Sequence, residues 1–192
     1  MKKLFDKIKE TLKSHPRAII AIDGMCASGK TTLANLLSEE FGFGIIHTDD
    51  FFLPYEMRTE ERLSQPGGNI HYERFIEEVI IPLKENKDFE YRVFDCSSGE
   101  FNEKRKFLHS TSVIIEGAYS LLPEIPDIYN LKIFLCTSPE TQLERIKKRN
   151  GTAALGIFKE KWIPFENRYF ETFGIAKKCD ITINTDNPFN YE

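Results

Sequence analysis

Five short apolar runs are separated along the chain by segments whose apolar residues recur at helical spacing. Continuous apolar runs of this length are typical of strands that are buried on both faces. Strands that alternate with helices favour a parallel sheet, so the pattern predicts a three-layer α/β fold with a central parallel sheet of about five strands. The predicted strands are AIIAID (18–23), FGIIHTD (43–49), SVIIEG (112–117), LKIFLCT (131–137) and ITINT (181–185).

The segments between these runs predict helices and one hairpin. An N-terminal helix is expected over residues 1–16, where Pro16 ends it, and further helices are expected over 30–41, 72–83, 139–149 and 158–173. Residues 89–109 alternate in polarity and contain Ser98 and Gly99, which predict a hairpin turn. We find no repeat or second domain, and residues 1–192 are expected to form a single domain.

Composition excludes several classes of protein. The 30 acidic and 26 basic residues are spread along the chain and give a net charge of −4, which argues against a basic nucleic-acid-binding face. The start is charged, and no apolar run approaches the roughly 18 residues of a membrane span. The four cysteines form no CxxC pair, as expected in a reducing cytoplasm. We therefore expect a cytoplasmic protein with a small-molecule substrate and no membrane or nucleic-acid partner.

The segment GMCASGKTT (24–32) carries the clearest chemical signal. Gly24, Gly29, Lys30 and Thr31 fit the phosphate-loop pattern GxxxxGK[ST], between a predicted strand and a predicted helix as that motif requires. The glycines allow a tight turn whose backbone N–H groups surround phosphate oxygens at the positive end of the helix. The expected nucleotide-binding residues are Gly24, Met25, Cys26, Ala27, Ser28, Gly29, Lys30, Thr31 and Thr32.

The expected ligand of this loop is ATP with Mg²⁺. Lys30 is placed to reach the β and γ phosphates, and Thr31 is placed to offer a hydroxyl to Mg²⁺, which prefers oxygen ligands. The alternative for the segment is a glycine-containing turn that binds nothing. A phosphate loop alone does not separate a kinase from a GTPase or a motor, but the chain has no NKxD guanine signal and is too short for a large ATPase.

Acidic residues follow two of the other predicted strands. Asp49 and Asp50 in HTDDFFLP, and Glu116 in VIIEG, are expected at the same edge of the sheet as the phosphate loop. A carboxylate in the position of Asp49 can accept the proton of an attacking hydroxyl, hold Mg²⁺ through water, or do both, and Glu116 is a candidate to hold metal-bound water. The alternatives are a solvated acidic turn for Asp49 and Asp50, and an exposed loop residue for Glu116.

A basic segment over about residues 145–160 is a candidate lid over the phosphates. Arg145 and Arg149 share a helical face, and Asn150 and Gly151 predict a helix end directly after Arg149. Positive charge at this point stabilises the transferring phosphoryl group, and Arg149 is the preferred lid residue ahead of Arg168. The alternative is a solvated basic helix face. The neighbouring aromatic residues, Trp162, Phe165, Tyr169 and Phe170, are expected in the core.

The motifs GMCASGKTTLA, HTDDFF and VIIEGAYSL resemble, in the same order, those of the uridine kinase and phosphoribulokinase superfamily of P-loop kinases, including nicotinamide riboside kinases. The elements DDFFLP, PGGN and YERF are similar to those of a bacterial uridine kinase-like subgroup. The resemblance covers most of residues 17–185. It implies that Asp49 is the general base, that Glu116 is associated with Mg²⁺, and that Lys30 and Thr31 contact the nucleotide.

The same resemblance suggests residues that bind the phosphoryl acceptor. NIHYERF is similar to a segment that contacts ribose hydroxyls, which implies this role for Glu73 and, less directly, His71. An ordinary helix N-terminus is the alternative. The stretch FDCSSGEF retains Phe94, an expected substrate contact, and Asp95, but it lacks the histidine with which uridine kinases recognise the pyrimidine. A uracil pocket is therefore not expected, although the kinase chemistry is.

These patterns predict an ATP-dependent kinase that transfers the γ-phosphoryl group to a hydroxyl of a nucleoside or a similar metabolite. Another hydroxyl acceptor, such as pantothenate or a sugar phosphate, is the alternative within the same class. A regulatory protein that binds ATP without transferring phosphate is the alternative from another class. Asp49 and Glu116 discriminate between the two classes, because a pure binder needs neither carboxylate beside the phosphates.

Overall fold

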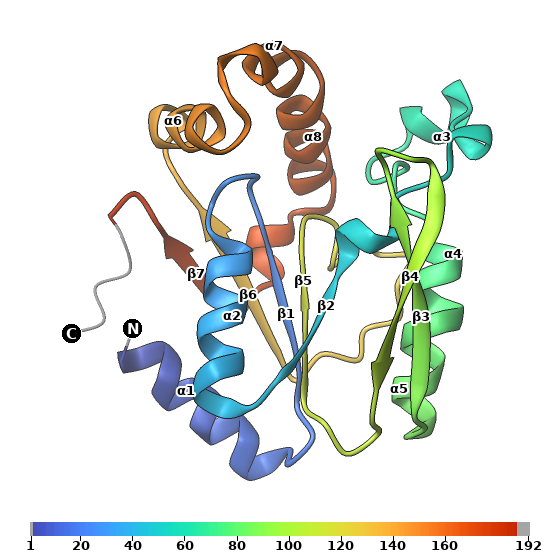
Figure 1. Cartoon of the computed structure of the whole chain (residues 1–192). Coiled ribbons are helices and arrows are strands. Elements are labelled where there is room, and N and C mark those ends of the chain that lie inside the picture. Colours follow the sequence, from blue (N-terminus) through green and yellow to red (C-terminus); the bar gives the residue numbers. More distant parts are fainter. Residues whose placement is uncertain (1, 188–192) are drawn as a thin grey trace.

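A five-stranded parallel sheet forms the centre of the chain, for which a computed structural model describes residues 2–187 (Figure 1). The strand order is β2–β5–β1–β6–β7, and every neighbouring pair is parallel. The predicted α/β fold and its five-stranded parallel sheet are thus confirmed. The strands are β1 (Ile19–Gly24), β2 (Gly44–His47), β5 (Val113–Glu116), β6 (Leu131–Cys136) and β7 (Ile181–Asn184).

The register of the sheet brings the ends of three strands together. Strand β1 pairs with β5 so that Ile22 lies opposite Glu116, while β2 pairs with β5 so that His47 lies opposite the same Glu116. Because parallel strands end at a common edge, the loop after β1 and the turn after β2 emerge beside Glu116. This edge is where the candidate residues were expected.

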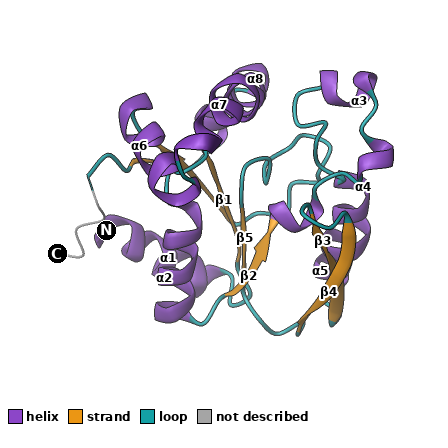
Figure 2. Cartoon of the chain, turned by 45° about the horizontal axis from the view of Figure 1, so that its top comes forward, coloured by secondary structure: helices purple, strands orange, loops and turns teal. Residues whose placement is uncertain are grey.

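Helices cover both faces of the sheet. On one face, α1 and α2 bury Leu4, Ile8, Leu33 and Leu37 against the sheet. On the other face, the elements between β2 and β5 and the C-terminal helix α8 form a second core, and Figures 1 and 2 show these layers. The α-helices are α1 (Lys2–Ser14), α2 (Lys30–Phe41), α3 (Glu60–Ser64), α4 (Tyr72–Phe75), α5 (Ile81–Glu85), α6 (Pro139–Asn150), α7 (Leu155–Ile157) and α8 (Ile163–Phe173).

The predicted hairpin is present as a separate two-stranded antiparallel sheet, β3 (Phe89–Asp95) and β4 (Glu100–Phe107). Its turn contains Gly99 at φ 76°, a left-handed conformation that glycine adopts without strain. Tyr91 of β3 is buried and packs on Phe51 and Phe107. The hairpin is therefore attached to the second core and stands next to the turn that follows β2.

Two predicted helices contain a wider turn before an internal proline. The helix expected over 72–83 continues from α4 through a π-helical segment (Ile76–Ile80) into α5, which contains Pro82. The helix expected over 158–173 has a π-helical segment (Phe158–Trp162) ahead of Pro164 in α8. Proline lacks an N–H and its ring collides with a carbonyl one turn earlier, and a wider turn relieves both problems.

The strand predicted over residues 43–49 is shorter than expected. Strand β2 ends at His47, and residues Thr48–Phe51 form a 3₁₀ turn. The Thr48 hydroxyl donates a hydrogen bond to the Ala118 carbonyl at 2.9 Å, which draws the chain away from the strand direction. Within residues 2–187, no helix has both the length and the apolar character needed to cross a membrane.

Candidate functional site

The phosphate loop, residues 24–32, connects β1 to the first turn of α2. Gly24 has φ 140°, and a Cβ atom at this position would lie 2.1 Å from the Leu135 carbonyl oxygen. Gly29 has φ 93° and directly precedes α2. Ala27 also has a positive φ, 57°, which is costly for a residue with a side chain and is typical of functional sites. The predicted loop conformation therefore depends on residues without large side chains.

The ammonium group of Lys30 lies across this loop. It donates hydrogen bonds to the carbonyl oxygens of Gly24 at 2.7 Å and Met25 at 2.9 Å. Nearby, the hydroxyl of Ser28 is buried without a hydrogen-bond partner. A cation and an unpaired hydroxyl beside a backbone turn of this kind fit the oxygens of a phosphate group.

Thr31, Glu116 and His47 meet at the edge of the sheet. The Thr31 hydroxyl donates to Glu116 Oε1 at 3.1 Å, and His47 Nδ1 lies 2.5 Å from the same oxygen. The hydrogen bond to Glu116 raises the pKa of His47, against the opposing effect of burial. Glu116 is buried, with 4% of its surface exposed.

The geometry of this group bears on how Mg²⁺ could bind. Within residues 2–187, no cluster of three or more His, Cys, Asp or Glu side chains could hold a metal ion by itself. Thr31 and Glu116 offer a hydroxyl and a carboxylate, which are oxygen ligands that suit Mg²⁺. These residues fit an ion that completes its coordination with phosphate oxygens and water, as Mg²⁺ does in nucleotide sites.

Asp49 and Asp50 point to different surroundings. Asp49 lines the same pocket as Lys30. Its side chain is accessible within the pocket, but the surrounding walls shield it from bulk water and raise its pKa, while the charge of Lys30 opposes this effect. Asp50 is buried instead, where it accepts a hydrogen bond from Tyr91 at 2.8 Å and pairs with Arg105 at 3.1 Å.

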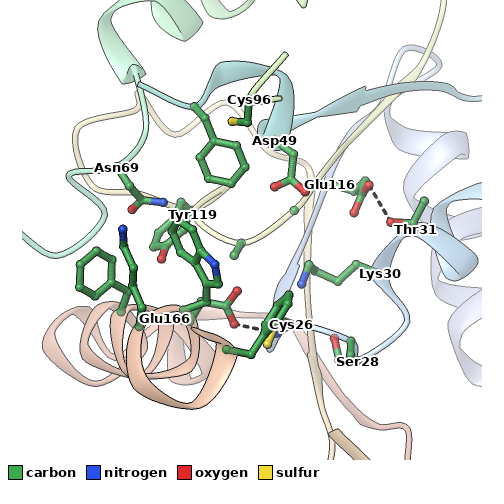
Figure 3. Close-up of a pocket in the computed structure, with 18 of the residues that line it drawn as sticks. Cys26, Ser28, Lys30, Thr31, Asp49, Asn69, Cys96, Glu116, Tyr119 and Glu166 are labelled. Atoms are coloured by element: carbon green, nitrogen blue, oxygen red, sulfur yellow. Dashed lines mark hydrogen bonds between the residues drawn. The ribbon is translucent and has the colours of Figure 1, made fainter. Parts of the chain in front are cut away.

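A pocket of about 1030 Å³ contains the phosphate loop, Asp49 and Glu116 (Figure 3). Aromatic side chains form much of its remaining wall, and among them are Phe52, Tyr119, Trp162 and Phe165. The expectation that Trp162 and Phe165 belong to the core is therefore wrong, because the π-helical turn before Pro164 places them at the pocket. Tyr169 is in the core as expected, and Phe170 packs against it.

The basic residues of the predicted lid have different surroundings. Arg149 lines the pocket and is exposed at the end of α6. Arg145 also lines the pocket, but it donates to the Ala27 carbonyl at 3.3 Å and to Thr185, so it supports the phosphate loop. Arg168 donates to the Leu63 carbonyl at 2.9 Å and does not line the pocket.

The three residues expected to bind the acceptor, Glu73, His71 and Phe94, do not lie together in the pocket. Glu73 is in a two-point ion pair with Arg62, at 2.8 and 2.9 Å, and neither Glu73 nor His71 lines the pocket. Phe94 borders a second hollow of about 430 Å³, which shares Asp49 and Phe52 with the main pocket. Of these three residues, the structure brings only Phe94 to the side of Asp49.

Sequence patterns missed three polar residues. Asp23 is fully buried and accepts hydrogen bonds from the Gly24 N–H at 2.7 Å and from the Tyr169 hydroxyl at 2.7 Å. Glu166 of α8 and Asn69 both line the pocket. The position of Asp23 before Gly24 was a usable signal, whereas Glu166 and Asn69 lie far from the phosphate loop in the sequence.

Taken together, the fold and this pocket define a P-loop nucleotide-binding protein. The family model described as "AAA domain" matches residues 20–171, and the chain belongs to this family. A cytidylate kinase from Thermotoga neapolitana is 25% identical over 164 residues, which cover 74% of each chain.

Two solved structures share the fold. One, a protein of Silicibacter sp. TM1040 described as a candidate fructose transport system kinase, has a TM-score of 0.68 and 24% identity. That match covers 87% of this chain and 89% of the other. A structure described as a possible uridine kinase from Bacillus stearothermophilus has a TM-score of 0.63 and 24% identity, with 94% and 99% covered. The expected resemblance to uridine kinases is thus supported at the level of the fold.

Proposed function

We propose that the chain is an ATP-dependent kinase that transfers the γ-phosphoryl group to a hydroxyl of a small metabolite. The observation that carries this proposal is that Asp49 shares one pocket with Lys30 of the phosphate loop. A carboxylate in this position is the group needed to orient an acceptor hydroxyl and take its proton. The kinases among the similar proteins support ATP-dependent phosphoryl transfer, and they include both a cytidylate kinase and a possible uridine kinase.

Each residue has a defined task in this proposal. Lys30 exchanges its hydrogen bonds with the loop carbonyls for bonds to phosphate oxygens. Thr31 and Glu116 would hold Mg²⁺, which, when bound, neutralises charge on the phosphates. Asp49 accepts the proton of the attacking hydroxyl, and Arg149 adds positive charge at the pocket rim.

The distribution of arginines favours a hydroxyl acceptor over a phosphate acceptor. Among the described residues, Arg58 is the only arginine of the segment 48–119 that lines the pocket. The other arginines of that segment are bonded to carboxylates or backbone carbonyls: Arg62, Arg74, Arg92 and Arg105. A nucleoside monophosphate carries a doubly charged group, and arginines are well suited to bind such a group. Within the described residues, the acceptor side of the pocket offers Arg58 for this task, since Arg145 supports the phosphate loop and Arg149 lies at the end of α6.

The wall beyond Asp49 suits an uncharged acceptor with a flat or apolar part. Phe52, Tyr119 and Trp162 provide apolar surface there. Asn69 is 7% exposed and its Nδ2 has no hydrogen-bond partner, so a donor is available for a polar atom of the acceptor. Within the described residues, no histidine lines either hollow, and we expect uridine to be a poor substrate.

A screen of ADP release tests the proposal. The purified protein with Mg²⁺ and ATP is offered nucleosides, nucleoside monophosphates, sugars, sugar phosphates and vitamins, with the Lys30→Ala variant as the control for contaminating kinases. We expect turnover with a hydroxyl compound and none with the variant. Turnover only with monophosphates would contradict the hydroxyl acceptor. Tight ATP binding without turnover on any compound would favour the regulatory alternative.

A further inference from the structure

The buried carboxylate of Glu166 lies directly on the phosphate loop. Its Oε2 atom accepts a hydrogen bond from the Cys26 N–H at 2.7 Å, and Gln142 donates to the carbonyl of the same Cys26 at 3.1 Å. Glu166 is 8% exposed and lines the pocket (Figure 3). The backbone N–H groups of such a loop are the groups that bind nucleotide phosphates. The Glu166 carboxylate therefore already occupies one of the backbone N–H groups that could bind a phosphate.

Few opposite charges compensate this carboxylate. Within the described residues, Glu166 takes part in no ion pair. The Lys30 ammonium, whose charge acts on it from α2, is bonded to two loop carbonyls instead. Asp49 faces it from the turn after β2 and adds negative charge. Burial raises the pKa of the Cys26 thiol to about 12 and also raises that of the Tyr119 hydroxyl, so both stay neutral.

Four further basic side chains line the same pocket: Arg58, Arg145, Arg149 and Lys161, of which Lys161 lies over the Trp162 ring. Arg145 and Arg149 line the same pocket, but Arg145 is bonded to Ala27 and Thr185, and Arg149 is bonded to Asn150 at 2.8 Å. Within the described residues, Glu166 is therefore held by hydrogen bonding to Cys26, through the backbone N–H at 2.7 Å, and by no ion pair. The phosphates of a bound nucleotide would bring more negative charge to this N–H, and anions that share a site shielded from water repel each other strongly.

We propose that Glu166 takes up one proton from solvent when nucleotide phosphates bind, and that the resulting carboxylic acid donates a hydrogen bond within the phosphate subsite. This inference rests on the proposed binding of a nucleotide at the loop. Burial raises the pKa of Glu166 to about 7, and the positive charge of Lys30 opposes this effect only in part. Near neutral pH the protonated and ionised forms of Glu166 therefore differ little in free energy.

The direction of the pH effect follows from this coupling. Bound phosphates raise the pKa of Glu166 further, so above about pH 7 the bound protein holds more protons than the free protein. Nucleotide affinity then falls as the pH rises through this range. Below about pH 6 Glu166 is already protonated in the free protein, and the effect vanishes.

The first test uses the Glu166→Gln variant, in which the amide keeps an acceptor for Cys26 and supplies a donor like the protonated acid. Affinity for an imido analogue of ATP with Mg²⁺ is measured by calorimetry at about pH 6 and about pH 8.5. We expect the variant to bind about tenfold tighter than the wild type at the higher pH and within about twofold at the lower pH. Glu171→Gln, on an exposed position of the same helix, should behave as the wild type at both.

A second test needs only the wild type and does not depend on the folding of the variant. Calorimetry at about pH 8 in two buffers of different protonation enthalpy reports the protons taken up on binding, and we expect clear uptake by the wild type. Absence of uptake, or equal or weaker binding by Glu166→Gln at about pH 8.5, would overturn the inference while leaving the proposed kinase intact. Failure of the wild type to bind the analogue at all would instead overturn the proposed function and this inference with it.

Discussion

Asp49 and Asp50 are adjacent in the chain, yet Asp49 lines the pocket that contains Lys30, whereas Asp50 is hydrogen-bonded to Tyr91 in the hairpin. The 3₁₀ turn after β2 separates their directions. This geometry assigns different tasks to two identical side chains. One is available to an acceptor, and the other joins the turn to β3.

The two neighbours therefore form a matched pair for mutagenesis. Asp49→Asn should lower kcat by about 10² to 10⁴, the usual contribution of a positioned general base, and leave ATP affinity within a few fold. Asp50→Asn should retain most of the turnover and lower the free energy of unfolding by about 1–3 kcal/mol, because it weakens buried bonds. Steady-state kinetics measures kcat for both variants, and urea unfolding measures their free energies of unfolding. The opposite assignment of effects would show that Asp50 is the base.

The phosphate loop could be predicted because its signal is local. Two glycines, a lysine and a threonine at fixed spacing determine a strand-to-helix turn, and nothing distant is needed to read it. Glu166 and Asn69 could not be predicted, since each reaches the pocket only through the packing of elements far away in the sequence. The ion pair that takes Glu73 away from the pocket likewise depends on Arg62, in a short helix that no pattern indicated.

Most of the sheet was predictable because buried parallel strands are continuously apolar. The end of β2 was not predictable. The hydroxyl of Thr48 donates a hydrogen bond to the Ala118 carbonyl at the sheet edge, and the 3₁₀ turn begins there, so the strand ends two residues before the predicted position. The position of Trp162 was also missed, since helical spacing assumes a regular turn and the π-helical segment changes the direction of this side chain.

Asp23 links the phosphate loop to α8 through Tyr169. The Tyr169 hydroxyl is buried, and it donates to a carboxylate that is itself fully buried. Tyr169→Phe removes this donor, so we expect a loss of about 1–3 kcal/mol in the free energy of unfolding, measured by urea denaturation. Tyr72→Phe is the control, because its hydroxyl accepts a bond from Arg62 at a less buried site, and it should cost less. An equal cost for both would contradict the proposed link.

The contact between His47 and Glu116 predicts a pH dependence of stability. The hydrogen bond to Glu116 raises the pKa of His47 in the folded protein above its unfolded value of about 6.5. Its stabilising effect is therefore fully present below about pH 6.5 and is lost as the pH rises through the folded pKa. We expect the stability difference between the wild type and His47→Asn to shrink from about pH 6 to about pH 9 in urea unfolding.

The difference between the two proteins isolates His47 from other titrating groups. The raised pKa of Glu166, about 7, also makes stability depend on pH. Glu166 is present in both proteins, so its contribution cancels in the difference between them. His15→Asn, at an exposed position outside the pocket, is the control for the loss of a histidine elsewhere in the chain. A His47→Asn difference that is constant or grows with pH would show that the charged pair does not form.

Asn69 provides the most direct test of where the acceptor binds. Its Nδ2 is buried at the pocket wall without a partner, so we expect an acceptor atom to receive its hydrogen bond. Asn69→Leu keeps a similar size and removes the donor, and it should raise the acceptor KM by about tenfold with little change in ATP affinity. Gln65→Leu, at a nearby exposed position, is the control for the added apolar side chain. An unchanged acceptor KM, or a loss of ATP affinity of the same size, would place the acceptor elsewhere in the pocket.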